Sequence, residues 1–222
     1  PYLPFSEREA DDINVQLSRQ GYSVNLYSGL AGTEIMLKEE GSLAPDHVSP
    51  SILHISTHGF FFPQPDASIS DSRLSEDYVF KLSNHSMLRS GLLFSGVNPY
   101  WLQTKESTYS NEGILTAYEI SQLKLDHTNL VVLSACETGL GDIKGFEGVF
   151  GLQRAFKIAG ANQVITSLWQ IPDFQTYELM DLFYKGYLEQ KLSARQALKF
   201  AQDKMRQKRY EPFYWAGFVL ME

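Results

Sequence analysis

The single cysteine of this chain, Cys136, comes directly after an apolar run at 130–135 (LVVLSA) that is typical of a strand buried on both faces. His58 comes directly after a second strand-like run at 51–57 (SILHIST). Because parallel strands joined by crossover connections end at the same edge of a sheet, we expect the thiol and the imidazole to lie near each other. An imidazole can take the proton of a thiol and return it to a departing amine, so this pair predicts thiol-dependent cleavage of an amide bond.

The residue after the histidine is a glycine, which leaves a backbone N–H group unshielded. The N–H groups of Gly59 and Cys136 are therefore candidates for an oxyanion hole. Both side chains also have an ordinary structural interpretation. A buried cysteine is often a small hydrophobic residue, and a lone histidine such as His58 is often a hydrogen-bonded structural residue. Position alone leaves both interpretations open.

Metal and phosphate chemistry are weaker interpretations of the same stretches. His54 and His58 have an H-x-x-x-H spacing, but in a strand they would lie about 13 Å apart, too far for two ligands of one ion. We therefore predict no metal site and expect His54 to be a packed, hydrogen-bonded histidine. The glycine-bearing loop 139–148 lacks both the G-K-[ST] ending of a P-loop and the spacing of G-x-G-x-x-G, so no nucleotide or other cofactor is expected.

The composition excludes several classes of partner. The net charge is −7 and the basic residues are scattered, which argues against binding of nucleic acid. The sequence has no apolar run of about 18 residues, so no membrane-spanning helix is expected. One cysteine cannot form an intramolecular disulfide and fits a reducing compartment, so we expect a cytoplasmic protein. The sequence begins PYLPF without an initiator Met, which we interpret as an excised domain or a processed fragment.

Strand-like and helix-like patterns alternate along the chain, which predicts one α/β domain over 1–222 with a mostly parallel central sheet covered on both faces. The expected strands are 22–27, 51–57, 90–97, 130–135, 163–169 and 214–221. The expected helices are 6–20, 33–39, 116–123, 146–159, 174–190 and 194–209. Two long stretches, 59–89 and 98–111, lack firm periodicity. We expect 60–90 and 98–112 to be mobile without substrate and to border the cleft; the alternative is that they are ordered surface insertions with no gating role.

Five residues are expected to cap helix N-termini, because their side-chain oxygens can accept a hydrogen bond from the first turn: Ser6, Thr33, Thr116, Asp173 and Ser193. Three of them are followed at the third position by Glu or Gln, which completes a capping box: Ser6, Thr116 and Ser193.

Five segments of the chain resemble one known family: HISTHGFF (54–61), RSGLLFSG (89–96), GILTAYEI (113–120), LVVLSACETGLGDIKGFEGVFGLQRAFKIAGANQVITSLWQIPD (130–173) and FYWAGFVL (213–220). They are similar to the CHAT domain, a member of the caspase-like (clan CD) cysteine peptidases, with separase and gingipain as relatives. The resemblance covers nearly the whole chain.

The resemblance implies a three-layer α/β/α caspase–haemoglobinase-like fold. It also implies a cysteine endopeptidase that hydrolyses a protein substrate through His58 and Cys136, in a regulated bacterial defence or cell-death pathway. CHAT domains commonly follow tetratricopeptide or other repeat regions, so an N-terminal repeat region or another activating partner is expected. The alternative is a caspase-like module kept as a non-catalytic scaffold, and retention of both dyad residues argues against it.

The chain departs from caspases around the cysteine. It has Ser134-Ala135-Cys136 where the caspase signature has Q-A-C, so a preference for Asp is not carried over. The resemblance places the substrate-binding pocket beside the cysteine strand and the next strand, which makes Ser134, Trp169 and Asp173 its candidate walls. Metacaspases select Arg or Lys with an acidic residue at the position of Ser134, and here only Asp173, whose competing interpretation is the helix cap, could replace it. Basic and large apolar substrate residues are therefore both expected.

Overall fold

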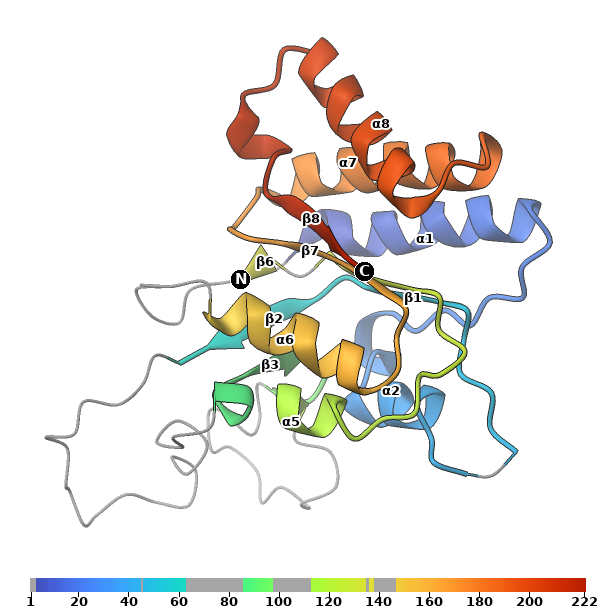
Figure 1. Ribbon diagram of the computed structural model, residues 1–222, viewed down its shortest axis with the longest axis vertical. Helices are drawn as coiled ribbons and strands as arrows, with labels where there is room; N and C mark the ends of the chain where they lie inside the picture. The colour runs from blue at the N-terminus through green and yellow to red at the C-terminus, as the bar shows by residue number, and fades with distance from the viewer. Residues whose placement is uncertain (1–2, 45, 63–85, 98–112, 135, 138–146) are drawn as a thin grey trace, which may run out of the picture.

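The computed structural model describes residues 3–44, 46–62, 86–97, 113–134, 136–137 and 147–222. Their strands form two sheets of four strands each (Figure 1). Sheet A has the strand order β1 (Ile52–Ile55), β5 (Leu130–Leu133), β7 (Gln163–Ser167) and β8 (Phe218–Met221). Sheet B has the strand order β4 (Ile114–Thr116), β3 (Ser90–Leu93), β2 (His58–Phe61) and β6 (Cys136–Glu137).

Sheet A is mostly parallel, as the sequence predicts. β1 pairs with β5 and β5 pairs with β7 in parallel, while β8 pairs with β7 in antiparallel orientation at one edge. All four residues of β5 are buried, which explains why this strand is a continuous apolar run rather than an alternating one. The predicted α/β class with a mostly parallel sheet is confirmed.

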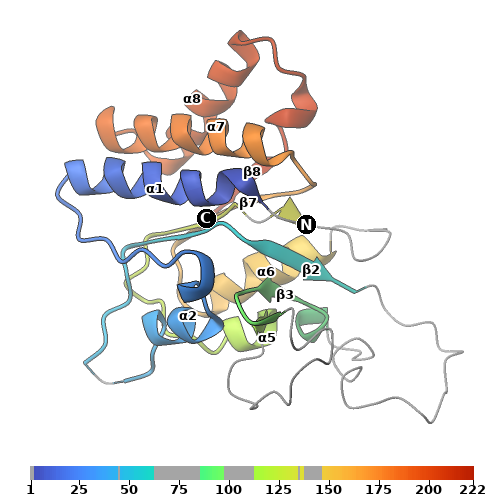
Figure 2. The ribbon, with the colours of Figure 1, turned by 180° about the vertical axis from the view of Figure 1, so that it is seen from behind.

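Helices cover both faces of sheet A (Figures 1 and 2). One face carries α1 (Pro4–Arg19), α7 (Asp173–Tyr184) and α8 (Ala194–Gln207). The opposite face carries α2 (Glu34–Glu40), α5 (Ala117–Ile120) and α6 (Glu147–Ile158). We refer to these as the α1 face and the α2 face.

The side chains of β5 point alternately to these two faces, so the strand contributes to an apolar core on each of them. Leu130 and Val132 belong to the core cluster that contains residues of α1, α7 and α8. Val131 and Leu133 belong to the cluster that contains residues of α2, α5 and α6. Each strand residue thus contributes to only one of the two cores, since successive side chains of a strand point to opposite faces.

Two strands of sheet A continue into sheet B after a short break. The predicted strand at 51–57 ends its pairing with β5 at Ile55, and a new strand begins at His58 and pairs with β3 and β6. In the break, the Thr57 hydroxyl donates to the Leu93 carbonyl of β3. His58 therefore does not follow the end of one long strand, as predicted, but opens a strand of the second sheet.

Three predicted helix caps are confirmed. The Thr33 hydroxyl accepts a hydrogen bond from the first turn of α2. Thr116 and Glu119 form the predicted capping box at the start of α5, and Ser193 and Gln196 form the other at the start of α8. These caps depend on residues three positions apart, so the sequence alone was enough to find them.

The caps predicted at Ser6 and Asp173 are wrong. α1 begins earlier, at Pro4, a residue that suits the first helical position because it lacks the N–H that would have no partner there. The Ser6 hydroxyl instead donates to the Leu3 carbonyl at 3.1 Å. α7 has Pro172 at its N-cap, so Asp173 is already its first helical residue.

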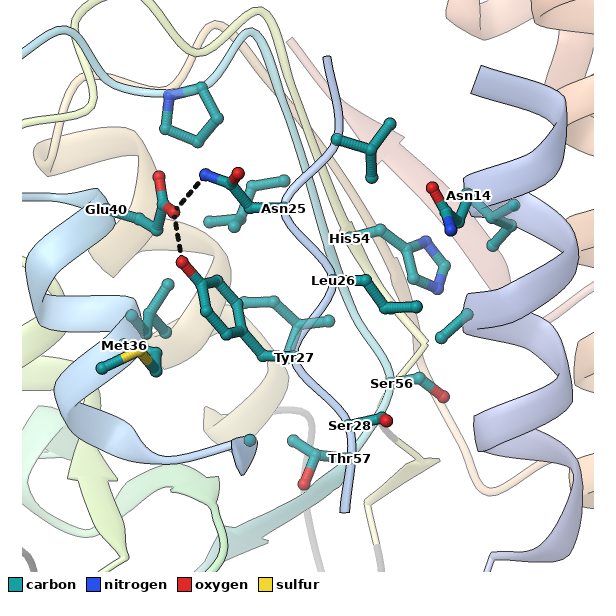
Figure 3. Close-up of a pocket in the computed structure, with 18 of the residues that line it drawn as sticks. Asn14, Asn25, Leu26, Tyr27, Ser28, Met36, Glu40, His54, Ser56 and Thr57 are labelled. Carbon is teal, nitrogen blue, oxygen red and sulfur yellow. Dashed lines mark hydrogen bonds between the residues drawn. The ribbon is translucent and has the colours of Figure 1, made fainter. Parts of the chain in front are cut away.

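The predicted strand at 22–27 is also wrong as a member of a sheet. This segment runs beside β1 (Figure 3), but among the strands of the described residues β1 pairs only with β5 and is an edge strand. The predicted helix at 174–190 ends as an α-helix at Tyr184 and continues as a π-helical turn over Lys185–Glu189.

Most of the two stretches predicted to be mobile loops lies outside the described residues, at 63–85 and 98–112. The described ends of the first stretch are β2 and a 3₁₀ turn at Ser86–Leu88, which directly precedes β3.

Candidate active site

The carboxyl ends of β1 and β5 lead into β2 and β6. His58 and Cys136, the predicted catalytic pair, are the first residues of these two strands. His58 and Cys136 are Cα partners in the parallel register of β2 and β6, as are Gly59 and Glu137. Neighbouring strands lie about 4.8 Å apart, so the backbones of His58 and Cys136 lie side by side. The structure thus brings the two residues together in the backbone, and their catalytic roles stay a prediction.

Ser134 lies in the short link between β5 and β6, two residues before the cysteine. It is 4% exposed, and its N–H donates to the Ile55 carbonyl at 2.9 Å. Its hydroxyl oxygen has no hydrogen-bond partner among the described residues. Since buried hydroxyl groups are normally hydrogen-bonded, this group is suited to contact a ligand or a water molecule.

Trp169 follows the carboxyl end of β7 and is positioned by Phe213 and Gly217. Its indole N–H donates to the Phe213 carbonyl at 2.8 Å, and its ring stacks on the Phe213 ring with centroids 6.4 Å apart. A Cβ added at Gly217 would lie 2.8 Å from the indole, so the glycine makes room for the ring. Phe213 is 51% exposed, which leaves an aromatic surface open to solvent beside the carboxyl edge of sheet A.

Asp173 begins α7 and binds the start of α1. Its carboxylate accepts a hydrogen bond from the Phe5 backbone N–H at 2.6 Å. Burial raises the pKa of the Asp173 carboxyl above its ordinary value, and the charge of Glu9 adds to this, whereas the Phe5 hydrogen bond and the charge of His58 lower it. Asp173 therefore lies within electrostatic range of His58, although it follows a different strand.

A buried chain of three polar side chains lies behind this edge, between β1 and the helices of the α1 face. The predicted hydrogen-bonded role of His54 is confirmed: its Nε2 lies 2.8 Å from Glu9 Oε1 and its Nδ1 lies 3.2 Å from the Tyr184 hydroxyl. Burial, assisted by the charge of Glu9, raises the pKa of Tyr184 well above its ordinary value. The neutral Tyr184 hydroxyl can thus donate to Nδ1 while Nε2–H donates to the carboxylate, a tautomer that we assign from these partners. Figure 3 shows His54 directed from β1 toward α1.

Gly59 lies inside β2, with β3 on one side and β6 on the other. A Cβ added there would lie 3.6 Å from the Gly91 carbonyl oxygen and 4.0 Å from Leu152 Cδ1, which are ordinary contacts with described residues. Packing therefore does not by itself require a glycine. The oxyanion hole assigned to Gly59 and Cys136 stays a prediction.

Comparison with known proteins decides the family. The CHAT domain family model matches residues 1–222, which is the whole chain. The chain belongs to the CHAT domain family.

Two relatives of this CHAT domain are tetratricopeptide repeat proteins. Tetratricopeptide repeat protein 28 of Mus musculus is 33% identical over 113 residues, and Tetratricopeptide repeat protein 28 of Homo sapiens is 34% identical over 112 residues. Each alignment covers 50% of this chain but only 4% of the relative. Both relatives are mammalian, so they lend no support to the bacterial setting that the resemblance implies.

Two further properties of the CHAT domain concern its described residues only. None of its helices there is long and apolar enough to cross a membrane. Within the same ranges, no three His, Cys, Asp or Glu side chains are grouped as ligands of one metal ion.

Two residues that contribute to the candidate site of this CHAT domain, Phe213 and Phe5, were not predicted from the sequence. Phe213 belongs to the terminal aromatic motif FYWAGFVL, so that motif was a usable signal for the stacked pair with Trp169. Phe5 carried no signal, because its contribution is a backbone N–H that reaches Asp173 from 168 positions away.

Proposed function

We propose that this CHAT domain is a cysteine endopeptidase with a caspase–haemoglobinase-like three-layer arrangement. The observation that carries the proposal is the register of β2 and β6, which makes His58 and Cys136 direct backbone partners. Membership of the CHAT family, whose members resemble caspases, supports the same reaction class.

In the proposed mechanism, the Cys136 thiol transfers its proton to His58 and the thiolate sulfur attacks the carbonyl carbon of the scissile peptide bond. His58 then gives the proton to the departing amine, which leaves a thioester on the sulfur. A water molecule adds to the thioester, releases the carboxylic acid and regenerates the thiol. Backbone N–H groups are proposed to stabilise the negative oxygen of each tetrahedral intermediate, with that of Cys136 among them. A reducing compartment such as the cytoplasm would keep the thiol available.

The walls of the proposed substrate pocket are Ser134, Trp169 and Asp173. Ser134 offers a buried hydroxyl oxygen, and the indole of Trp169 with the ring of Phe213 offers an aromatic surface. Asp173 does not cap α7 by its side chain, so its carboxylate is available to attract a basic side chain in addition to the Phe5 N–H. We propose that the pocket accepts basic or large apolar residues and shows no preference for Asp.

The relatives suggest the context of this domain. Both carry the name of a tetratricopeptide repeat protein, and we propose that a repeat region or another protein partner controls access of the protein substrate. A defence or cell-death pathway stays a prediction of the family resemblance.

The alkylation rate of the cysteine tests the dyad without a known substrate. Because the chain has one cysteine, a single mass addition by iodoacetamide reports Cys136 alone. At pH 6.5 an ordinary thiol, with a pKa of about 8.5, is almost fully protonated, so we expect His58→Ala to slow alkylation at least about 10-fold. His127→Ala removes an exposed histidine and serves as the matched control with an unchanged rate.

A peptide library then tests turnover and selectivity. Cys136→Ala and His58→Ala should each lower cleavage by at least about 10³-fold while the fold persists. A profile dominated by Asp on the acyl side of the cut would contradict the proposed pocket. Wild-type alkylation no faster than that of His58→Ala, together with an absence of cleavage, would favour the non-catalytic scaffold.

A further inference from the structure

Arg89 is a buried cation at the start of β3. It directly precedes Ser90, the first residue of that strand, and it is only 2% exposed. A guanidinium group keeps its positive charge at physiological pH and carries several N–H donors. Because removing a charge from water costs free energy, arginine is rarely buried to this extent unless an anion pairs with it.

The described residues supply little compensation for this charge. The guanidinium Nη1 of Arg89 donates to the Phe62 carbonyl at 2.5 Å, which is the one hydrogen bond that this side chain makes to described residues. None of the ion pairs between described residues includes Arg89. Its Nε–H group is buried and has no hydrogen-bond partner in that part of the chain. A charged donor is therefore held inside the fold without an acceptor.

The surroundings of the guanidinium hold it in one orientation. Arg89 and Phe62 extend the antiparallel ladder of β2 and β3, since the Phe62 N–H donates to the Arg89 carbonyl at 2.8 Å. These two strands lie side by side in Figure 2. The guanidinium carbon lies 5.6 Å from the centre of the Phe61 ring, a distance at which a cation is attracted to an aromatic face. The carbonyl and the ring together fix the group, so its remaining donors are preorganised.

A purely structural role does not account for the remaining donors. A contact with the Phe62 carbonyl requires one N–H group, and a neutral side chain could supply it without burying a charge. The adjacent polar residue shows the usual arrangement: Ser90 is also buried, and its hydroxyl donates to the Ser86 carbonyl at 3.2 Å. Since buried polar groups are normally hydrogen-bonded, the Nε–H of Arg89 is an exception within its own neighbourhood.

The unused donors determine the chemistry of the missing partner. The Nε–H group and one N–H group of Nη2 point in the same direction, and this edge of a guanidinium can bind two oxygen atoms of one group at the same time. Carboxylate and phosphate groups offer such a pair of oxygen atoms. A chloride ion offers a single acceptor, and a carbonyl group offers no negative charge to balance the cation.

We propose that Arg89 binds an oxyanion, a carboxylate or a phosphate group, through the edge formed by Nε and Nη2. Nη1 stays on the Phe62 carbonyl while the oxyanion is bound. The register of β2 and β3 pairs His58 with Leu93 at one end and Phe61 with Ser90 at the other, so Arg89 lies beyond the end of β2 that is distant from His58. The oxyanion site is therefore separate from the candidate catalytic pair and does not depend on the proposed peptidase function.

NMR of the arginine Nε–H groups in the full chain tests this proposal. The signal of Arg89 is assigned by its loss in Arg89→Lys, and sodium acetate, sodium phosphate and sodium chloride are compared at equal ionic strength. We expect a saturable shift of this signal with acetate or phosphate and none with chloride. Saturation by acetate assigns a carboxylate ligand, and saturation by phosphate alone assigns a phosphate group. The signal of Arg154, which is exposed on α6, is the control and should not saturate.

Thermal denaturation gives a second measurement. A ligand that binds only the folded state raises Tm, so the anion that shifts the signal should raise the wild-type Tm by about 4 °C over chloride at about ten times its dissociation constant. Arg89→Met should lose this rise, whereas Arg154→Met should keep it. Arg89→Lys retains the charge but not the edge with two donors, so it should bind the anion at least about 10-fold more weakly.

Either of two results would overturn the proposal. The first is an Arg89 signal that shifts with neither oxyanion, or that shifts equally with chloride, because the guanidinium would then be buried without a selective oxyanion site. The second is a rise in Tm that is as large in Arg89→Lys as in the wild type, which would place the bound anion elsewhere. Both results can be obtained from the wild type and Arg89→Lys alone, even if Arg89→Met does not fold.

Discussion

The two faces of sheet A each bury one glutamate, and the two carboxylates have different surroundings. On the α2 face, Glu34 is 4% exposed and both of its oxygens have partners, the Lys38 ammonium at 2.9 Å and the Ile114 N–H at 3.1 Å. On the α1 face, Glu9 is 1% exposed, and only one of its oxygens has a partner among the described residues, His54 at 2.8 Å.

The two carboxylates also differ in which groups they contact and influence. Glu34 connects α2 to β4, so its carboxylate joins a helix of one face to the second sheet. Glu9 connects α1 to β1 through His54, and its charge also raises the pKa of Asp173 and of Tyr184. The face that carries the start of α1 and α7 is therefore the one whose electrostatics reach the candidate active site.

The largest expected effect comes from breaking the α1-face pair. His54→Ala leaves the Glu9 carboxylate buried without its partner, which should lower the free energy of unfolding by about 3–5 kcal/mol. Urea denaturation followed by circular dichroism measures this change. His127→Ala, on the exposed surface, is the control, and a loss at His54 no greater than at His127 would contradict a stabilising contact between His54 and Glu9.

Removing the α2-face carboxylate should have the next largest effect. Glu34→Ala leaves the buried Ile114 N–H without its acceptor, whereas the Lys38 ammonium keeps Glu119 as a second partner at 3.1 Å, so the change should cost about 2 kcal/mol of unfolding free energy. Glu39→Ala removes an exposed carboxylate from the same helix and should have almost no effect. If Glu34→Ala lowered the unfolding free energy as much as His54→Ala, the two buried carboxylates would contribute equally to stability.

A double substitution sharpens the contrast between the faces. In the His54→Ala background, Glu9→Gln removes the uncompensated charge and should recover at least about 1.5 kcal/mol, because the buried charge is the main source of the loss. A double-mutant cycle in urea gives the coupling between the two residues. Additive losses would contradict a direct charge interaction.

The smallest expected effect concerns Asp173 and its dependence on pH. Burial raises the pKa of Asp173 above its ordinary value of 3.8, so the folded state holds the proton more tightly than the unfolded state. The resulting stabilisation is complete below the unfolded-state pKa and is lost as pH rises through the folded-state pKa. Asp173→Asn keeps an acceptor for the Phe5 N–H and lacks this titration, so the variant should gain on the wild type by at most about 0.5 kcal/mol as pH rises.

Thermal denaturation of the wild type and of Asp173→Asn from pH 3 to 7 measures how the difference in stability between them changes with pH. Asp173→Ala, which also removes the acceptor, should be less stable than Asp173→Asn at every pH. A wild-type advantage that grows with pH would show that the ionised carboxylate is stabilised in the folded state, contrary to the expected direction.

Local patterns in the sequence were sufficient for much of the fold. The apolar run of β5 predicted a strand covered on both faces, and the spacing of Thr116 and Ser193 from their partners predicted two capping boxes, because these features depend on residues close in the chain. The proximity of His58 and Cys136 could be predicted for a related reason, because parallel strands bring their carboxyl ends to one edge of the sheet.

The failures have a common physical origin in distant contacts. Asp173 was expected to cap its own helix, but its carboxylate accepts a hydrogen bond from the Phe5 N–H, which is 168 positions away in the chain. The segment 22–27 has the side-chain alternation of a strand, yet a strand also requires a neighbour at hydrogen-bonding distance, and no described residue fills that position. The break after Ile55 depends on β3, whose Leu93 carbonyl binds Thr57.

The breaks between β1 and β2 and between β5 and β6 occur at the same level of two adjacent strands. His58 and Cys136 therefore belong to sheet B, whereas Trp169 and Asp173 follow a strand of sheet A. Under the proposed function, the pair that attacks the bond is thus held by one sheet, whereas two of the proposed pocket walls follow a strand of the other.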